Sequence, residues 1–233
     1  MVRKSKNKKV LLVGVGQHAK VVSSMIVDDN NLKLIGVIGT GIVNKYKKSS
    51  IFLNYKKKKI KYLGNLDNIK KIKFDQLAIA IGDNYLRELI YKKIKLLFGK
   101  KRINLAKIIS KNSKISDNVE IGPGTIILSG SIINFNSVIG SNCLINNSVS
   151  INHDNIIKDF ASIGPGVITG GNVKVGSNSH IGIGSTLKNN IIIEENIVIG
   201  GGSFVNKNCK KNFVYYGVPA KPIRKRKKSE KYY

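Results

Sequence analysis

The chain has 233 residues, of which 42% are hydrophobic, and carries a formal net charge of +28 at pH 7. This apolar content argues against intrinsic disorder, and the absence of any run of 18 apolar residues excludes a membrane-spanning helix. The basic N-terminus lacks the hydrophobic region and cleavage site of a signal peptide, and two cysteines suggest no disulfide framework. We therefore expect a cytoplasmic protein without membrane insertion.

The positive charge is concentrated at the periphery of the sequence. Residues 1–9, 45–61 and 221–233 hold 20 of the 41 basic residues, whereas residues 103–208 contain seven lysines against six acidic residues. Charge runs of this kind are usually solvated tails or loops. We predict no specific nucleic-acid binding, and the sequence assigns no role to the basic segments 45–61 and 221–233.

The N-terminal half begins with a predicted strand over residues 10–13, a glycine-containing turn over residues 14–19 and a helix over residues 20–27. Strand, glycine turn and helix form the layout of a dinucleotide-type fold, in which glycine lets the backbone approach a phosphate at the helix N-terminus. Gly16, Gln17 and His18 lie in this turn, although His18 could equally be a turn residue that caps the helix.

Further strands are predicted at residues 34–38 and 77–80. The second of them leads through Gly82, Asp83 and Asn84 into a helix over residues 85–97. Residues 45–61 are interpreted as a basic loop and residues 98–102 as a linker. We predict a Rossmann-like α/β domain over residues 1–102.

The C-terminal half repeats an aliphatic residue every six positions. Between Ile109 and Val205, sixteen of the seventeen positions in this series are aliphatic, and the remaining one is Thr169. A period of six fits neither an α-helix nor an alternating strand. It fits a chain that turns a corner every six residues, so that three hexads form a triangular coil of eighteen and Gly and Asn supply the positive φ at the corners. A chance β-sandwich rich in isoleucine would not maintain this register.

This hexad pattern resembles the bacterial hexapeptide-repeat transferases. The resemblance implies a left-handed parallel β-helix over residues 103–233, with a basic C-terminal tail and active sites between the subunits of a homotrimer. The segments "VGVGQHAKVV", "IAIGDN", "NHD" and "GVPAKPI" further resemble the sugar O- and N-acetyltransferases. That group includes the sialic acid O-acetyltransferase-like and the UDP-4-amino-sugar N-acetyltransferase-like proteins.

The resemblance implies an enzyme that transfers an acetyl group from acetyl-CoA to the amine or hydroxyl of a nucleotide-linked sugar in surface-glycan biosynthesis. The N-terminal domain would bind the nucleotide through Gly16, Gln17, His18, Asp83 and Asn84. Relatives usually end the second strand with acidic residues that contact the nucleotide, whereas this chain has Val-Ile-Gly-Thr at residues 37–40. The identity of the nucleotide therefore remains open. The sequence also does not distinguish which sugar is the acceptor, whether transfer is to nitrogen or oxygen, or how long the acyl group is.

His153 is the candidate general base. Acyl transfer needs a base with a pKa near neutrality, and His153 lies two residues after a core position, which places it at a corner outside the packed axis. The resemblance matches His153 and Asp154 to the catalytic histidine and its carboxylate. Gly171 is eighteen residues further along, hence one coil away on the same corner, and matches the glycine whose N–H is the oxyanion donor.

Four further residues are candidates for contact with acetyl-CoA, and the resemblance matches Ile183, Gly201 and the position of Ser162 to such contacts. Ile183 and Gly201 lie eighteen residues apart, so they share a corner, and plain turn geometry would explain them equally well. Many relatives carry a histidine where this chain has Ser162. A histidine occurs here one coil later, as His180, where it either serves the same face or is a surface residue.

Two other chemistries are not favoured by the sequence. A zinc site would need more histidines than the repeat contains, and His153 and His180 are twenty-seven residues apart, hence on different corners, so we expect no metal. Cys143 falls on a small, inward-facing position and is interpreted as core rather than nucleophile. The alternative function is a catalytically inactive β-helix scaffold whose basic tails dock on anionic surfaces.

Overall fold

A computed structural model of the chain describes residues 7–41, 46–99, 101 and 103–232. Two compact units can be distinguished, residues 1–82 with 89–108 and residues 83–88 with 109–233. Helix α2 (Asn84–Phe98) contributes its first turn to the second unit and the rest to the first. The division between residues 102 and 103 that we predict from the sequence stays a prediction.

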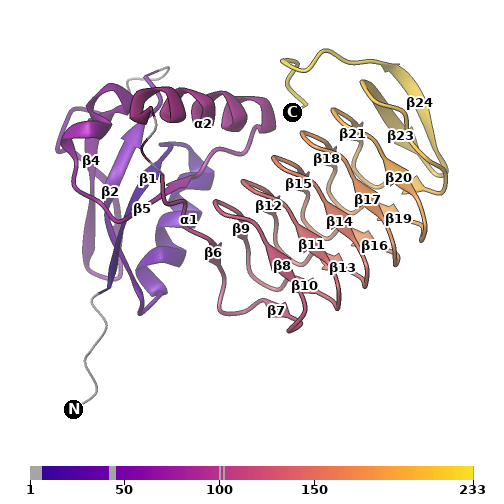
Figure 1. Cartoon of the computed structure of the whole chain (residues 1–233), viewed down its shortest axis with the longest axis horizontal. Helices are drawn as coiled ribbons and strands as arrows, with labels where there is room; N and C mark the ends of the chain where they lie inside the picture. The colour runs from indigo at the N-terminus through magenta and orange to yellow at the C-terminus, as the bar shows by residue number, and fades with distance from the viewer. Residues whose placement is uncertain (1–6, 42–45, 100, 102, 233) are drawn as a thin grey trace. The chain divides into compact units, whose positions relative to one another are not determined.

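The first unit is an α/β domain built on a five-stranded sheet (Figure 1). Its strand order is β3-β4-β2-β1-β5, with β1 (Lys8–Val13) parallel to both β2 (Leu32–Gly39) and β5 (Gln76–Ile79). Helix α1 (Gln17–Asp28) buries a face with helical spacing, made of Ala19, Val22, Ser23 and Ile26. The strands, glycine turn and helices predicted for this half are confirmed.

One prediction for this unit is wrong. The segment over residues 45–61 is not a loop, because its described part contains β3 (Ile51–Tyr55) and the start of β4 (Lys58–Asn65), which pair as an antiparallel hairpin. Phe52, Ile60 and Tyr62 are buried, while the lysines between them are exposed. The segment has few alternating apolar residues, and the many lysines on its solvent side make its sequence resemble a charged loop. A 3₁₀ helix (Leu66–Lys71) follows the hairpin.

The second unit is a parallel β-solenoid with three sheets (Figure 1). We name each sheet after one of its strands. The β15 sheet consists of β6 (Ile108–Ile109), β9 (Ile126–Ile127), β12 (Leu144–Ile145), β15 (Ser162–Ile163), β18 (His180–Ile181), β21 (Val198–Ile199), β23 (Phe213–Gly217) and β24 (Ala220–Lys225). The β13 sheet consists of β7 (Lys114–Ile115), β10 (Ile132–Ile133), β13 (Ser150–Ile151), β16 (Ile168–Thr169), β19 (Thr186–Leu187) and β22 (Phe204–Val205). The β14 sheet consists of β8 (Glu120–Ile121), β11 (Val138–Ile139), β14 (Ile156–Ile157), β17 (Lys174–Val175) and β20 (Ile192–Ile193).

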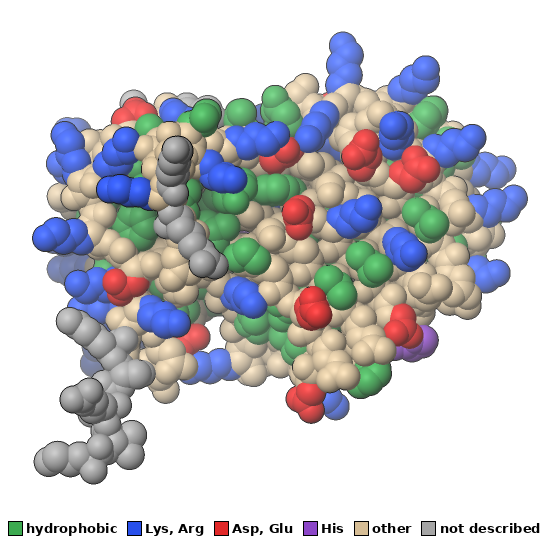
Figure 2. Space-filling view, in the orientation of Figure 1, with side chains coloured by type: hydrophobic (Ala, Val, Ile, Leu, Met, Phe, Trp, Pro, Cys, Tyr) green, Lys and Arg blue, Asp and Glu red, His purple; other side chains and the backbone are tan. Residues whose placement is uncertain are grey.

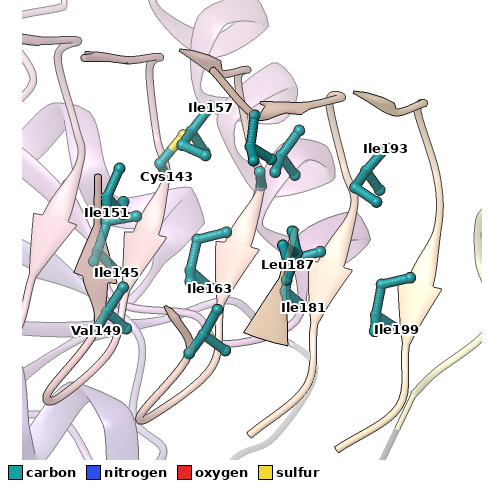
Figure 3. Close-up of a cluster of buried hydrophobic side chains, with 14 of the residues drawn as sticks. Cys143, Ile145, Val149, Ile151, Ile157, Ile163, Ile181, Leu187, Ile193 and Ile199 are labelled. Atoms are coloured by element: carbon teal, nitrogen blue, oxygen red, sulfur yellow. The ribbon is translucent and has the colours of Figure 1, made fainter. Parts of the chain in front are cut away.

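The register of the solenoid confirms the coil of eighteen residues. Ile145 pairs with Ile163, and Ile163 pairs with Ile181, so each aliphatic residue stacks on the one eighteen positions away. These side chains fill the axis of the solenoid (Figure 3). The one hydroxyl in the series, on Thr169, accepts a hydrogen bond from the Asn152 N–H, so its burial leaves no unpaired polar atom.

The corners of the solenoid also follow the six-residue period. From Gly124 to Gly202 every sixth residue has a positive φ, and most of these residues are Gly or Asn. Both residue types tolerate the left-handed region that a tight corner requires. The corner chemistry predicted from the sequence is confirmed, with Ser148, Asp154 and Phe160 as the departures from Gly and Asn.

Most charged side chains lie on the outside of the molecule, and Asp83, Arg87, Glu88 and Arg226 are buried. Figure 2 shows Lys and Arg side chains across one face, with fewer Asp and Glu and several apolar side chains among them. Within the described ranges, no helix combines the length and the apolar character needed to span a membrane.

Candidate active site

His153 lies in the corner between the β13 and β14 sheets. This corner follows β13 and precedes β14, and the His153 side chain is 64% exposed. Asp154 occupies the left-handed position of the same corner, with a φ of 59°, where the equivalent corners one coil before and one coil after carry Asn136 and Asn172. The His153 Nδ1 atom lies 2.7 Å from Asp154 Oδ2. The corner geometry therefore presents an imidazole and a carboxylate together on the surface.

The electrostatics of this pair favour an ionised Asp154. Hydrogen bonds from the His153 ring and from the Asn136 side chain hold the pKa of Asp154 below its usual range. Asp154 is therefore a carboxylate at neutral pH. It accepts a hydrogen bond from the Nδ1–H group of His153 and has no proton to donate. With the proton on Nδ1, the His153 Nε2 atom carries the lone pair of a base.

Gly171 lies directly against the His153 ring. A Cβ atom built on Gly171 would come within 2.5 Å of the His153 Cε1 atom and 2.6 Å of Nε2, so a glycine is needed here if the ring is to keep its place. The Gly171 carbonyl accepts the N–H of Asn190 from the next coil. Among the described residues, the Gly171 N–H has no hydrogen-bond acceptor, which leaves a donor next to Nε2.

Asn155 supports the histidine corner from inside the solenoid. It is fully buried, and its Nδ2 atom donates to the carbonyls of Asn152, His153 and Gly170, which join the corner to the next coil. Sequence reasoning missed this residue. The signal was present, because from Ser113 to Ser203 the inward positions two residues before each core aliphatic are otherwise small or aliphatic. This series is interrupted by an amide immediately after His153 and Asp154.

Replacement of Gly171 by alanine is expected to lower kcat/KM for acyl transfer by about 10²-fold, because a displacement of the base by roughly 1 Å costs that much. The ring must move, since the new methyl group would overlap it. Steady-state kinetics of the Gly171→Ala protein check this. The matched control is Gly166→Ala, at a corner where a Cβ meets no atom within 4 Å although its φ is 67°. Equal losses in both variants would mean that a disturbed corner, rather than overlap with the imidazole, causes the effect.

Ile183 and Gly201 lie together at another corner, between the β15 and β13 sheets. A Cβ atom on Gly201 would be 3.0 Å from Ile183 Cγ2, and the Gly202 N–H donates to the Ile183 carbonyl. Ile183 is 64% exposed, which is unusual for an isoleucine in this solenoid. The β13 sheet separates this corner from the His153 corner within one chain, so the structure does not bring the two groups together.

Ser162 and His180 occupy the outer face of the β15 sheet on adjacent strands. Ser162 is 1% exposed, and its hydroxyl is bonded to Asn84 and Arg87 from the first turn of α2. The His180 ring stacks on Tyr232 with a centroid separation of 4.0 Å. Burial, followed by the charges of Arg226 and Arg87, lowers the pKa of His180 to about 4, so the imidazole is neutral at pH 7. Neither residue lies near His153.

The residues predicted to contact the nucleotide fall into two groups. Gly16 and Gln17 are exposed and His18 is half-buried, at the carboxyl end of β1 next to the carboxyl end of β5. The chain order places the topological switch point of the sheet here, where open α/β folds bind ligands. A Cβ on Gly16 or Gly82 would meet no atom within 4 Å, which leaves space for a ligand.

Asp83 and Asn84 form the second group, and their polar atoms already have protein partners. The Asp83 carboxylate accepts the N–H of Leu86 and so caps α2. Asn84 is 1% exposed and donates to the Ser179 carbonyl. Their contact with a nucleotide stays a prediction.

Cys143 and Cys209 are buried free thiols, and burial raises the pKa of each to about 12. We expect the native protein to be unreactive toward dithiobis-nitrobenzoate over minutes, because both thiols stay protonated at neutral pH. The urea-unfolded protein should react with two equivalents. The absorbance of the released nitrothiobenzoate measures this, and rapid reaction of the native chain would contradict the burial.

No group of three or more His, Cys, Asp or Glu side chains that could hold a metal ion occurs within residues 7–41, 46–99, 101 and 103–232.

Residues 9–94 match the family described as the PglD N-terminal domain. A comparison with curated proteins gives no match.

Solved structures resemble this chain over nearly its whole length. PerB from Caulobacter crescentus, in complex with CoA and GDP-perosamine, has 23% identity, covers 93% of this chain and 97% of its own, and has a TM-score of 0.80. The acetyltransferase domain of PglB from Neisseria gonorrhoeae, with acetyl coenzyme A, has 21% identity, coverages of 94% and 100% and a TM-score of 0.81. WeeI from Acinetobacter baumannii has 22% identity, coverages of 92% and 99% and a TM-score of 0.75.

At these identities the similarity establishes the fold. The α/β domain, whose residues 9–94 match the PglD N-terminal domain, is followed by a left-handed parallel β-helix, as the sequence predicts.

Proposed function

We propose that this chain is an acetyl-CoA-dependent sugar acetyltransferase that acts on a nucleotide-linked amino sugar in surface-glycan biosynthesis. The observation that carries the proposal is the His153–Asp154 pair on a solenoid corner, with the imidazole against Gly171. The similar fold of PerB is seen with CoA and GDP-perosamine, and that of the PglB domain with acetyl coenzyme A. Relatives described as N-acetyltransferases favour an amine as the acceptor.

The residues support direct transfer without an acyl-enzyme. His153 Nε2 would take the proton of the attacking amine, while Asp154 orients the ring and stabilises the imidazolium. The Gly171 N–H would donate to the thioester oxygen as that oxygen gains negative charge. His153 would then return its proton to the departing thiolate. Acetyl-CoA supplies the activated acyl group, and neither cysteine is needed as a nucleophile.

We also propose a homotrimer. Ile183 and Gly201, which we predict to contact acetyl-CoA, lie on one corner of the chain, and His153 lies on another. A site that contains both corners therefore requires a second copy of the chain. Apolar side chains are exposed on the two sheets that flank His153, namely Ile132 and Ile168 on the β13 sheet and Val138 and Ile192 on the β14 sheet. Burying such a surface against another copy would stabilise the assembly.

The nucleotide would bind at the switch point of the first unit, beside Gly16, Gln17 and Gly82. The first N–H groups of α1 have no side-chain cap, because its N-cap residue is Gly16, and such groups favour a phosphate. At the end of β2, Gly39 lies against the Tyr62 hydroxyl and the Asn65 amide instead of a carboxylate. We propose that neutral groups recognise the nucleoside, in a protein located in the cytoplasm.

The test is thiol release from acetyl-CoA in the presence of UDP-, GDP-, dTDP- and CMP-linked amino sugars. We expect turnover with one nucleotide class, and acetylation of the amine by mass spectrometry. Hydroxyl acetylation would change the acceptor but keep the mechanism. Absence of turnover with every acceptor, together with salt-dependent binding to anionic vesicles, would favour the inactive scaffold.

A further inference from the structure

The C-terminal segment Arg226–Tyr232, which we call the strap, leaves the end of β24 and reaches the outer face of the β15 sheet. The Arg226 N–H donates to the Asn212 carbonyl, next to β23. Six residues later, Tyr232 stacks on His180 of β18. The strap therefore passes over the strands that lie between β24 and β18 in the sheet order, which are β23 and β21.

The end of the strap fits a polar socket. The Tyr232 hydroxyl donates to the Asn84 Oδ1 atom at 3.1 Å and accepts the Asn84 N–H at 3.3 Å. Burial raises the pKa of Tyr232 to about 12, so this hydroxyl remains a donor. The same Asn84 Oδ1 atom also accepts hydrogen bonds from Arg87 and Ser162. Tyr232 thus covers both positions, Ser162 and His180, at which the sequence predicts contact with the acyl donor.

Few contacts hold the strap between its ends. Lys228 pairs with Glu88 at 2.7 Å, and Glu230 pairs with Arg224 at 2.5 Å, and both pairs are sensitive to salt because they are partly exposed. Within the strap, the Glu230 N–H donates to the Lys227 carbonyl, the Lys227 N–H donates to Glu230 Oε2, and Arg226 Nη2 donates to the Glu230 carbonyl. Among the described residues, the backbone of residues 227–232 forms no ladder to a strand. A cavity of about 250 Å³ bordered by Val198, Arg226 and Tyr232 remains beside the strap.

The closed position leaves buried polar atoms unpaired. Arg226 is 6% exposed, and its Nε and Nη1 atoms have no hydrogen-bond partner among the described residues, nor does His180 Nδ1. Buried polar groups in a permanent packing contact are almost always paired, whereas this guanidinium donates only through its Nη2 atom, to the Glu230 carbonyl. Lifting the strap would return these atoms to water, so their burial disfavours the closed position of the strap relative to the open one.

We propose that the strap is an autoinhibitory cover, which must lift from Ser162 and His180 before an acyl donor can use this face. The proposal rests on the proposed function. If the strap is closed in about nine molecules of ten, the apparent KM for acetyl-CoA is raised about tenfold. Removal of the strap then lowers this KM about tenfold.

Two measurements test the proposal separately. The first is the rate of carbethoxylation of His180 by diethyl pyrocarbonate, read by peptide mass spectrometry, with the exposed His153 as an internal standard. The second is the KM for acetyl-CoA. The variants are a chain that ends at Lys227, Tyr232→Ala, and Tyr232→Phe, which keeps the stack but loses the bonds to Asn84. Lys228→Ala, which breaks the pair with Glu88, is matched by Lys231→Ala in the same strap.

We expect the truncation and Tyr232→Ala to raise the His180 rate and to lower KM, with Tyr232→Phe and Lys228→Ala intermediate and Lys231→Ala unchanged. An unreactive His180 in folded Tyr232→Ala and truncated proteins would overturn the proposal. A reactive His180 together with an unchanged or higher KM for acetyl-CoA and a lower melting temperature would also overturn the proposal. The strap would then stabilise the fold without restricting access of the acyl donor. If no variant transfers an acyl group although truncation makes His180 reactive, the result would contradict the proposed function. It would still support the strap as a cover of His180.

Discussion

Replacement of His153 by alanine is expected to lower kcat/KM for acetyl transfer by about 10²–10⁴-fold, the usual contribution of a general base. The side chain is 64% exposed and contributes to no core, so the variant should keep its melting temperature and its oligomeric state. Thiol release at saturating nucleotide sugar, together with thermal unfolding, checks both statements.

Asp154→Asn is the companion variant. The pKa of Asp154 is held low mainly by its hydrogen bond with His153, so its negative charge persists well below neutral pH and stabilises the imidazolium throughout the working range. Loss of the charge should reduce the rate less than loss of the base, and should shift the acid limb of the kcat/KM profile to lower pH. A His153→Ala protein that retains the normal rate would remove the proposed mechanism.

The solenoid could be predicted closely because its physical rule is local and repeats. Each core residue lies a fixed number of residues from the next corner. Each corner needs a residue with a positive φ, so Gly and Asn recur with the same six-residue period. His153 and Gly171 could be paired from the sequence for the same reason, since eighteen residues return the chain to the same corner.

The parts that the sequence did not reveal depend on contacts between segments with no fixed spacing. The β3–β4 hairpin has only a few buried side chains, Phe52, Ile60 and Tyr62, among exposed lysines, so its charge dominates the pattern. Ser162 and His180 have the correct period for one face, but nothing in the repeat indicates that Tyr232 covers them. Buried Arg87 is equally hidden, because its partners, including the Asn142 and Phe160 carbonyls, are more than fifty residues away.

Replacement of Leu187 by alanine is expected to destabilise the solenoid by about 2–5 kcal/mol, the range measured for large-to-small changes in cores. Leu187 is fully buried on the axis (Figure 3), and it is stacked between Thr169 and Val205 of the neighbouring coils. Its neighbour Thr186 points outward from the same two-residue strand and is exposed. Thr186→Ala should therefore change the unfolding free energy by less than about 0.5 kcal/mol.

Urea unfolding followed by far-UV circular dichroism compares the two variants, with equal m-values required before the free energies are subtracted. Because each coil contacts only its neighbours, the loss at Leu187 should appear as early exchange of amide protons in the adjacent coils rather than in the N-terminal α/β domain. A Leu187→Ala protein as stable as Thr186→Ala would mean that the aliphatic axis does not hold the coils together. The placement of His153 against Gly171, which depends on that stacking, would then lose its physical basis.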